Sequence, residues 1–161
     1  MPNQAGSRRV ATGFTLVELI IVISVAGILA ATLGPRFFTQ SVFSQRGFAD
    51  ELAAALRYTQ KTAVITGCAA QLTVTATTYV AAQQAASGNT CNPGDTTWTT
   101  AVRGPDGIAI SGTAPSSTTV SPTGVFQFND QGQLTSSPGT TLTIGARTIT
   151  IVSGTGLVRV Q

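Results

Sequence analysis

Three side chains carry most of the chemistry that this 161-residue sequence offers: one acid inside an apolar segment, and two cysteines. Glu18 lies near the start of the run FTLVELIIVISVAGILAATL, residues 14–33, which is otherwise uncharged. A charged side chain at the depth of a membrane costs about 2.5 to 3.5 kcal/mol on insertion scales. The sequence therefore predicts that a partner compensates for the charge of Glu18.

The two cysteines, Cys68 and Cys91, both follow the apolar run. A disulfide between them would close a loop of about two dozen residues and would stabilise the fold by about 3 kcal/mol. Metal binding is a poor alternative, because two cysteines without any histidine supply too few ligands. We predict a Cys68–Cys91 disulfide, with free thiols as the alternative if the chain stays in a reducing compartment.

The sequence offers no set of residues suited to catalysis. It has no histidine, its six acids are scattered, and its one lysine, Lys61, lies in a helical segment. Neither a nucleophile with its base nor a pair of carboxylates can be assembled from these residues. The sequence therefore predicts a protein that is not an enzyme and has neither a cofactor nor a metal site.

The apolar run, residues 14–33, has the length of one membrane-spanning helix, about 30 Å at 1.5 Å per residue. Arg8 and Arg9 precede it, which predicts a cytoplasmic N-terminus with the remainder of the chain on the opposite side of the membrane. A cleaved secretory signal peptide is the alternative, with the small residues of AATLG as its cleavage site. The length of the run and the charge of Glu18 argue against a signal peptide.

A second helical segment follows the apolar run. Gly34 and Pro35 predict a kink or local melting, because proline removes a backbone donor and restricts the residue before it. Beyond them the pattern predicts an amphipathic helix to about residue 65. Its apolar face contains Phe38, Val42, Leu52, Leu56, Thr59 and Ala63, its polar face contains Arg46, Asp50, Arg57 and Lys61, and Phe37, Phe43 and Phe48 are expected to pack in the core or between subunits.

The composition changes at Gly67, where Thr, Ser and Gly become abundant and charges become rare. Alternating β-branched residues predict an antiparallel sheet, whereas a disordered Ser/Thr stalk would not need them. In RTITIVSGTGLVRV we expect a hairpin that buries Ile149, Ile151 and Val160 together with Leu157 or Val158. The other predicted strands are AQLTVTA, TYVAAQ, TWTTAV, VFQFND and TTLTI.

The stretch RRVATGFTLVELI resembles the type III signal of type IV prepilins and type II secretion pseudopilins. The shared features are a short basic leader, then Gly13 and Phe14, and an acid at the fifth position of the mature chain. The resemblance implies that a prepilin peptidase cleaves after Gly13 and methylates the new amino terminus at Phe14. It also implies that Glu18 pairs with the Phe14 amine of a neighbouring subunit in the filament. The alternative is an isolated Glu18 that snorkels toward water.

Nearly the whole chain resembles the GspH/FimT group of minor pilins and pseudopilins, through ELAAALRYTQKTAVITG, FNDQGQL and TITIVSGTGLVRVQ. This resemblance implies an α+β, pilin-like fold, in which a long N-terminal helix packs on a C-terminal antiparallel β domain. The implied division is a leader peptide at 1–13, a transmembrane and assembly helix at 14–34, an amphipathic helix at 35–66 and a periplasmic β-sheet domain at 67–161.

The implied function is that of a minor pseudopilin of a type II secretion system, a structural subunit of the periplasmic pseudopilus. The alternative is a FimT-like minor type IV pilin that takes part in pilus assembly or DNA uptake. The implied location is the bacterial inner membrane, crossed once, with the C-terminal domain in the periplasm. The implied partners are other pilins or pseudopilins, the prepilin peptidase and inner-membrane lipid.

Some members of this group bind DNA through a Gly-Arg-x-Arg element near the C-terminus. The corresponding stretch is Gly156-Leu157-Val158-Arg159, which has only the second arginine. Because phosphate binding depends on clustered cations, the nearly neutral domain argues against DNA binding. If DNA does bind, we expect the contacts to come from Arg147 and Arg159, placed side by side on neighbouring strands. Other candidates for a binding patch are Trp98, Tyr79 and Arg103.

Overall fold

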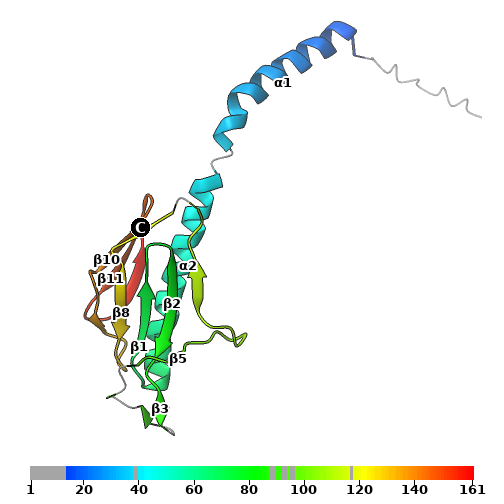
Figure 1. Ribbon diagram of the computed structural model, residues 1–161. Helices are drawn as coiled ribbons and strands as arrows, with labels where there is room; N and C mark the ends of the chain where they lie inside the picture. The colour runs from blue at the N-terminus through cyan, green and yellow to red at the C-terminus, as the bar shows by residue number, and fades with distance from the viewer. Residues whose placement is uncertain (1–13, 38–39, 88–89, 92–93, 95–96, 117) are drawn as a thin grey trace, which may run out of the picture. The chain divides into compact units, whose positions relative to one another are not determined.

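The computed structural model describes residues 14–37, 40–87, 90–91, 94, 97–116 and 118–161. The chain divides into two compact units, Met1–Thr39 and Gln40–Gln161, and each is described by itself. The described residues of the first unit contain helix α1, Leu16–Phe37. The second contains helix α2, Gln40–Thr66, and the strands (Figure 1). Helix, helix and antiparallel sheet follow in the order expected of an α+β, pilin-like fold, which confirms the predicted fold class.

Helix α1 continues past the Gly34–Pro35 pair. It ends at Phe37, so the local melting expected at Pro35 does not end the helix there. A proline removes one helical hydrogen bond and crowds the carbonyl four residues earlier, but it can itself adopt helical backbone angles. The helix therefore extends a further two residues beyond it.

Helix α2 is amphipathic, as its pattern predicts. Leu52, Leu56 and Ala63 are fully buried, whereas Arg57 and Lys61 on the other face are exposed. The helix ends at Thr66, immediately before Gly67. That glycine has φ of +66°, the left-handed conformation in which glycine commonly ends a helix.

The phenylalanines of this region have different surroundings. Phe48 is 3% exposed and belongs to the core, as expected. Phe43 is 71% exposed, so it does not contribute to the core of its own chain. The side chains of Phe37 and Phe38 lie outside the described residues. Of the three phenylalanines expected to pack, only Phe48 is seen to do so within the single chain.

In the described part of the chain the strands form two antiparallel sheets and a small hairpin (Figure 1). The first sheet has the order β5-β2-β1-β8-β9, with β6 also paired to β2, and the second has the order β12-β11-β10-β7. The strands are β1 Ala70–Val74, β2 Thr78–Gln83, β3 Ala86–Ser87, β4 Thr90–Cys91, β5 Thr100–Ala101, β6 Ser111–Thr113, β7 Val120–Ser121, β8 Gly124–Phe128, β9 Leu134–Ser136, β10 Thr141–Ile144, β11 Arg147–Val152 and β12 Leu157–Val160.

The apolar core lies between α2 and the inward residues of both sheets. Helix α2 contacts β1, β2 and β8 of the first sheet and β11 and β12 of the second. The register of β11 and β12 pairs Ile149 with Val160 and Ile151 with Val158. Leu157 is 47% exposed, so Val158 is the residue that joins the buried face of this hairpin. The larger fully buried side chains include Leu52, Leu56, Leu72, Val74, Val102, Phe126, Phe128, Leu142, Ile144, Ile149 and Ile151.

Gln60 of α2 joins the helix to the turns at the ends of both sheets. Its Nε2 donates to the carbonyl oxygen of Gly132 at 2.9 Å and to that of Thr155 at 2.8 Å. The backbone N–H of Leu134 also donates to the carbonyl of Ser153 at 3.1 Å. One amide side chain therefore fixes the position of two turns that are far apart in sequence.

The two cysteines form the predicted disulfide. Cys68, just after α2, is bonded to Cys91 on β4, with their Cα atoms 5.3 Å apart. Cys68 is buried and Cys91 is half-buried. The bond therefore attaches the β3–β4 hairpin to the junction between α2 and β1.

Replacing both cysteines, Cys68→Ser with Cys91→Ser, should lower the free energy of unfolding by about 3 kcal/mol, because the unfolded chain regains the freedom of a 23-residue loop. Chemical denaturation of the oxidised wild type and of the double variant measures the difference. A reducing agent should destabilise the wild type by a similar amount and leave the variant unchanged. Equal stability of the two proteins under oxidising conditions would contradict a stabilising disulfide.

A buried tyrosine connects the first sheet to α2. Tyr79 is 3% exposed, packs beside the ring of Phe48 and donates a hydrogen bond from its hydroxyl to Oε1 of Glu51 at 2.5 Å. Burial raises the pKa of the Tyr79 hydroxyl above its ordinary value, and the hydrogen bond and charge of Glu51 raise that pKa further. The Tyr79 hydroxyl of the folded protein therefore stays protonated at alkaline pH values at which a tyrosine of the unfolded chain ionises.

The contribution of Tyr79 to stability should therefore be lost at alkaline pH. Below about pH 10 the tyrosine is protonated in both the folded and the unfolded protein. Above about pH 10 only the unfolded protein loses this proton. The free energy of unfolding therefore falls by at most about 1.4 kcal/mol for each further pH unit. Tyr79→Phe should cost about 1 kcal/mol at pH 7 and should make the alkaline decline shallower. Denaturation curves between pH 7 and 11 measure both effects, and parallel declines in the two proteins would contradict this role of Tyr79.

Candidate functional site

Helix α1 presents apolar side chains on every face. Each of the large apolar residues between Phe14 and Leu29 is at least 50% exposed, and Glu18 is the one charged residue between them. An all-apolar surface of this kind needs an apolar environment. Within the part of the chain that the structure describes, no helix combines the length and apolarity needed to cross a membrane.

The first turn of α1 positions the acid. The side chain of Thr15 accepts a hydrogen bond from the backbone N–H of Glu18, with Oγ1 and N 3.3 Å apart. Thr15 and Glu18 thus have the T-x-x-E spacing of a capping box, and an acid in the first turn also interacts favourably with the helix dipole. These local effects hold Glu18 at a defined place near the start of the helix.

Neither of the groups expected to pair has a charged partner within the described chain. Phe14 is 79% exposed, and Glu18 is exposed and forms no ion pair with any described residue. Gly13, the expected cleavage position, lies outside the described residues. Cleavage after Gly13, methylation of Phe14 and pairing of Glu18 all remain predictions.

The two arginines considered as DNA contacts are not neighbours across the β11–β12 ladder. The register pairs Arg159 with Thr150, which is three residues from Arg147. Because side chains alternate between the faces of a strand, Arg147 shares the face of buried Ile149 and Arg159 lies on the opposite face. The expected side-by-side arrangement is therefore wrong, because an odd offset in register places the two side chains on different faces.

The aromatic candidates do not form an exposed patch together. Tyr79 is buried and hydrogen-bonded to Glu51, so it is not accessible to a ligand. Trp98 is half-buried and has φ of +50°, and Arg103 is exposed and donates to the carbonyl of Gly107 at 2.7 Å. Of the three, Trp98 and Arg103 remain available for contacts.

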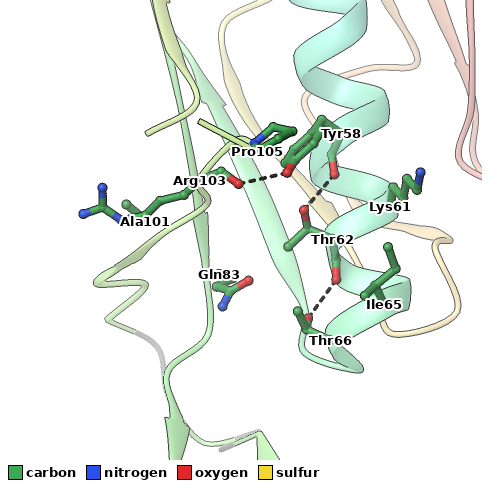
Figure 2. A pocket seen from close by; sticks show the side chains of 9 residues that line it. All are labelled: Tyr58, Lys61, Thr62, Ile65, Thr66, Gln83, Ala101, Arg103 and Pro105. Atoms are coloured by element: carbon green, nitrogen blue, oxygen red, sulfur yellow. Dashed lines mark hydrogen bonds between the residues drawn. The ribbon is translucent and has the colours of Figure 1, made fainter. Parts of the chain in front are cut away.

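A cavity of about 500 Å³ lies between the C-terminal half of α2 and the β2–β5 edge of the first sheet (Figure 2). The Tyr58 hydroxyl donates to the carbonyl of Arg103 at 2.9 Å, and the Thr62 hydroxyl donates to the carbonyl of Tyr58 at 2.9 Å. Figure 2 shows the charged ends of Lys61 and Arg103 pointing away from each other. The described lining contains no aspartate, glutamate or histidine.

Two family models match this chain. The prokaryotic N-terminal methylation motif matches residues 8–34, and the type II transport protein GspH matches residues 49–159. The second match covers more than half of the sequence. The chain belongs to the GspH family. No curated protein and no solved structure matches it significantly.

Membership of the GspH family gives the chain the role of a minor pseudopilin or pilin. Each match covers a different part of the structure. The methylation motif covers most of α1, and the GspH match covers most of α2 and the strands up to Arg159. The GspH family is a family of structural pseudopilins and pilins.

Two contributors to the architecture of this GspH-family chain were missed from the sequence. The cap formed by Thr15 had a readable signal, the T-x-x-E spacing ahead of an apolar run. Gln60 had none, because a glutamine in an amphipathic helix does not indicate which backbone carbonyls it will reach.

Proposed function

We propose that this GspH-family chain is a minor pseudopilin of a type II secretion system, a structural subunit of a periplasmic pseudopilus that takes part in protein secretion. The observation that carries the proposal is the order of the two family matches, a methylation motif at residues 8–34 followed by the type II transport protein model at 49–159. The proposed location is the inner membrane, with residues 14–33 in the bilayer and the β domain in the periplasm.

The proposed assembly step uses the N-terminal segment. Removal of residues 1–13 would create a positive amine at Phe14, and the exposed apolar surface of α1 would pack among the α1 helices of other subunits. In that low-dielectric environment an unpaired Glu18 carboxylate would destabilise the helix bundle. The positive amine of a neighbouring Phe14 would stabilise this carboxylate. The pairing also sets the axial register between subunits, because it fixes the start of one helix against another.

The alternative is a FimT-like minor type IV pilin, which would use the same leader and helix for pilus assembly or DNA uptake. Arg159 is exposed and could contact DNA, but its expected partner Arg147 lies on the other face of β11. Gel shifts at two salt concentrations, with Arg147→Ala and Arg159→Ala combined, test this function. DNA binding that depends on salt and on these arginines would favour the alternative.

A deletion strain complemented with the wild-type chain distinguishes the two machines. We expect loss of protein secretion in the deletion strain, its restoration by the wild type, and no change in surface pili. Lost piliation or lost DNA uptake with normal secretion would contradict the type II secretion proposal. Crosslinking of the complemented chain to other pseudopilins provides the matching physical measurement.

A further inference from the structure

A second cavity, of about 180 Å³, lies where the start of α2 meets the β10–β11 turn. Two arginines from different elements line it, Arg46 of α2 and Arg147 of β11. Arg46 is exposed and Arg147 is half-buried. The volume is several times the roughly 30 Å³ that one water molecule occupies in the liquid. Arg147, which does not neighbour Arg159, therefore has Arg46 as its basic neighbour.

No aspartate or glutamate side chain lines this cavity. Neither arginine forms an ion pair with any described residue, and the acid one turn after Arg46, Asp50, is not within ion-pair distance of it. The other polar lining residues are Gln45 and Gln161, and Gln161 also carries the α-carboxylate at the end of the described chain. Two guanidinium groups present planar sets of donors suited to the oxygen atoms of a phosphate.

The remaining lining is apolar. It consists of Val42, which is 40% exposed, buried Ile144, and Ala146. A ligand that combines a phosphate with an aliphatic portion would match both parts of the lining. Phospholipid headgroups have this chemistry.

We propose that Arg46 and Arg147 bind the phosphate of an anionic phospholipid headgroup in the membrane that holds the same chain. The proposal rests on the membrane location of residues 14–33 in the proposed function. The connection from Leu33 to Gln40 spans at most about 25 Å even when fully extended. Arg46 lies within two turns of the start of α2, a further 9 Å or so. Because this connection is short, the two arginines would experience a high effective concentration of lipid headgroups.

A DNA phosphate fits these observations less well. Residues 40–161 contain six basic and five acidic residues, a net charge of one, whereas affinity for duplex DNA depends on many clustered cations. A single headgroup needs only one small cationic site. The scarcity of charge that argues against DNA does not argue against a lipid.

The test uses the full chain in nanodiscs of phosphatidylcholine, with and without phosphatidylglycerol, and measures amide hydrogen exchange. Phosphatidylglycerol should slow exchange in residues 41–47 and 144–149 about fivefold or more. Each basic side chain near an anionic surface strengthens association about fivefold, so Arg46→Gln with Arg147→Gln should weaken docking about thirtyfold and remove this protection. Lys61→Gln with Arg159→Gln, which removes the same charge from two exposed positions outside the cavity, should retain it.

The other outcomes overturn the proposal in distinguishable ways. Absence of protection by phosphatidylglycerol, or equal protection in the Arg46 and Arg147 variant, removes the headgroup site and leaves the proposed function intact. Equal protection by inorganic phosphate in phosphatidylcholine discs identifies a free-phosphate site instead, and protection by duplex DNA alone identifies a DNA site. A chain that does not enter the nanodiscs overturns both this proposal and the membrane location on which it rests.

Discussion

Replacing Glu18 with alanine should lower incorporation of the chain into filaments at least about a hundredfold, while the protein still reaches the membrane. The reason is that the variant leaves a neighbour's amine without its counter-charge in a low-dielectric helix bundle, and breaking a buried ion pair costs about 3 to 5 kcal/mol. Shearing filaments from cells and measuring the chain in the sheared and membrane fractions tests this.

Two control variants separate pairing from other effects of the change. Thr15→Ala removes the cap that accepts the N–H of Glu18, so a loss as large as that of Glu18→Ala would assign the defect to helix capping. Ser24→Ala alters another exposed polar side chain of α1, whose hydroxyl donates to the carbonyl of Ile20, and should have little effect. Normal incorporation of Glu18→Ala would contradict the pairing.

Gly156→Ala should lower the free energy of unfolding by about 3 kcal/mol or more. Gly156 has φ of +65°, which costs a residue with a Cβ about 1 to 2 kcal/mol. The added Cβ would also overlap the carbonyl oxygen of Gly132 and approach the Gln60 amide. Displacing Gln60 would remove its two hydrogen bonds, worth about 1 kcal/mol each.

Gly154→Ala is the matched control for this prediction. It lies two residues away in the same turn, and a Cβ there would meet no atom within 4 Å. Thermal and chemical denaturation of both variants should show a large loss for Gly156→Ala and a change near zero for Gly154→Ala. Equal stabilities would show that the contact between the two turns does not matter, and would also remove the role assigned to Gln60.

The elements with a strong periodic signal could be predicted from the sequence. The buried face of α2 and the β11–β12 hairpin follow from spacing alone, because burial selects apolar residues at 3.6-residue and two-residue periods. Strand β2 occupies all of the predicted TYVAAQ segment. Of the predicted TWTTAV segment only Thr100–Ala101 forms a strand, β5. The two-residue strands β3, β4 and β7 were not predicted, since their positions depend on which other strand they meet.

The arrangement of the candidate sites could be predicted only in part. The disulfide followed from the count of cysteines. The role of Glu18 stays a prediction. The distance between Arg147 and Arg159 depends on the register of β11 and β12. A register shift of one residue moves every side chain of a strand to the opposite face of the sheet. For this reason we expected Arg147 to lie beside Arg159. In the fold the two side chains lie on opposite faces of the sheet, and Arg147 lines a cavity together with Arg46.

The most direct test of the account is the mass of the mature amino terminus, measured on chain purified from membranes of cells that have a prepilin peptidase. The first residue should be Phe14, its amine should carry one methyl group, and residues 14–33 should be retained. Gly13→Leu should block this processing. A mature chain that begins near Leu33, released by an ordinary signal peptidase and lacking α1, would contradict the account.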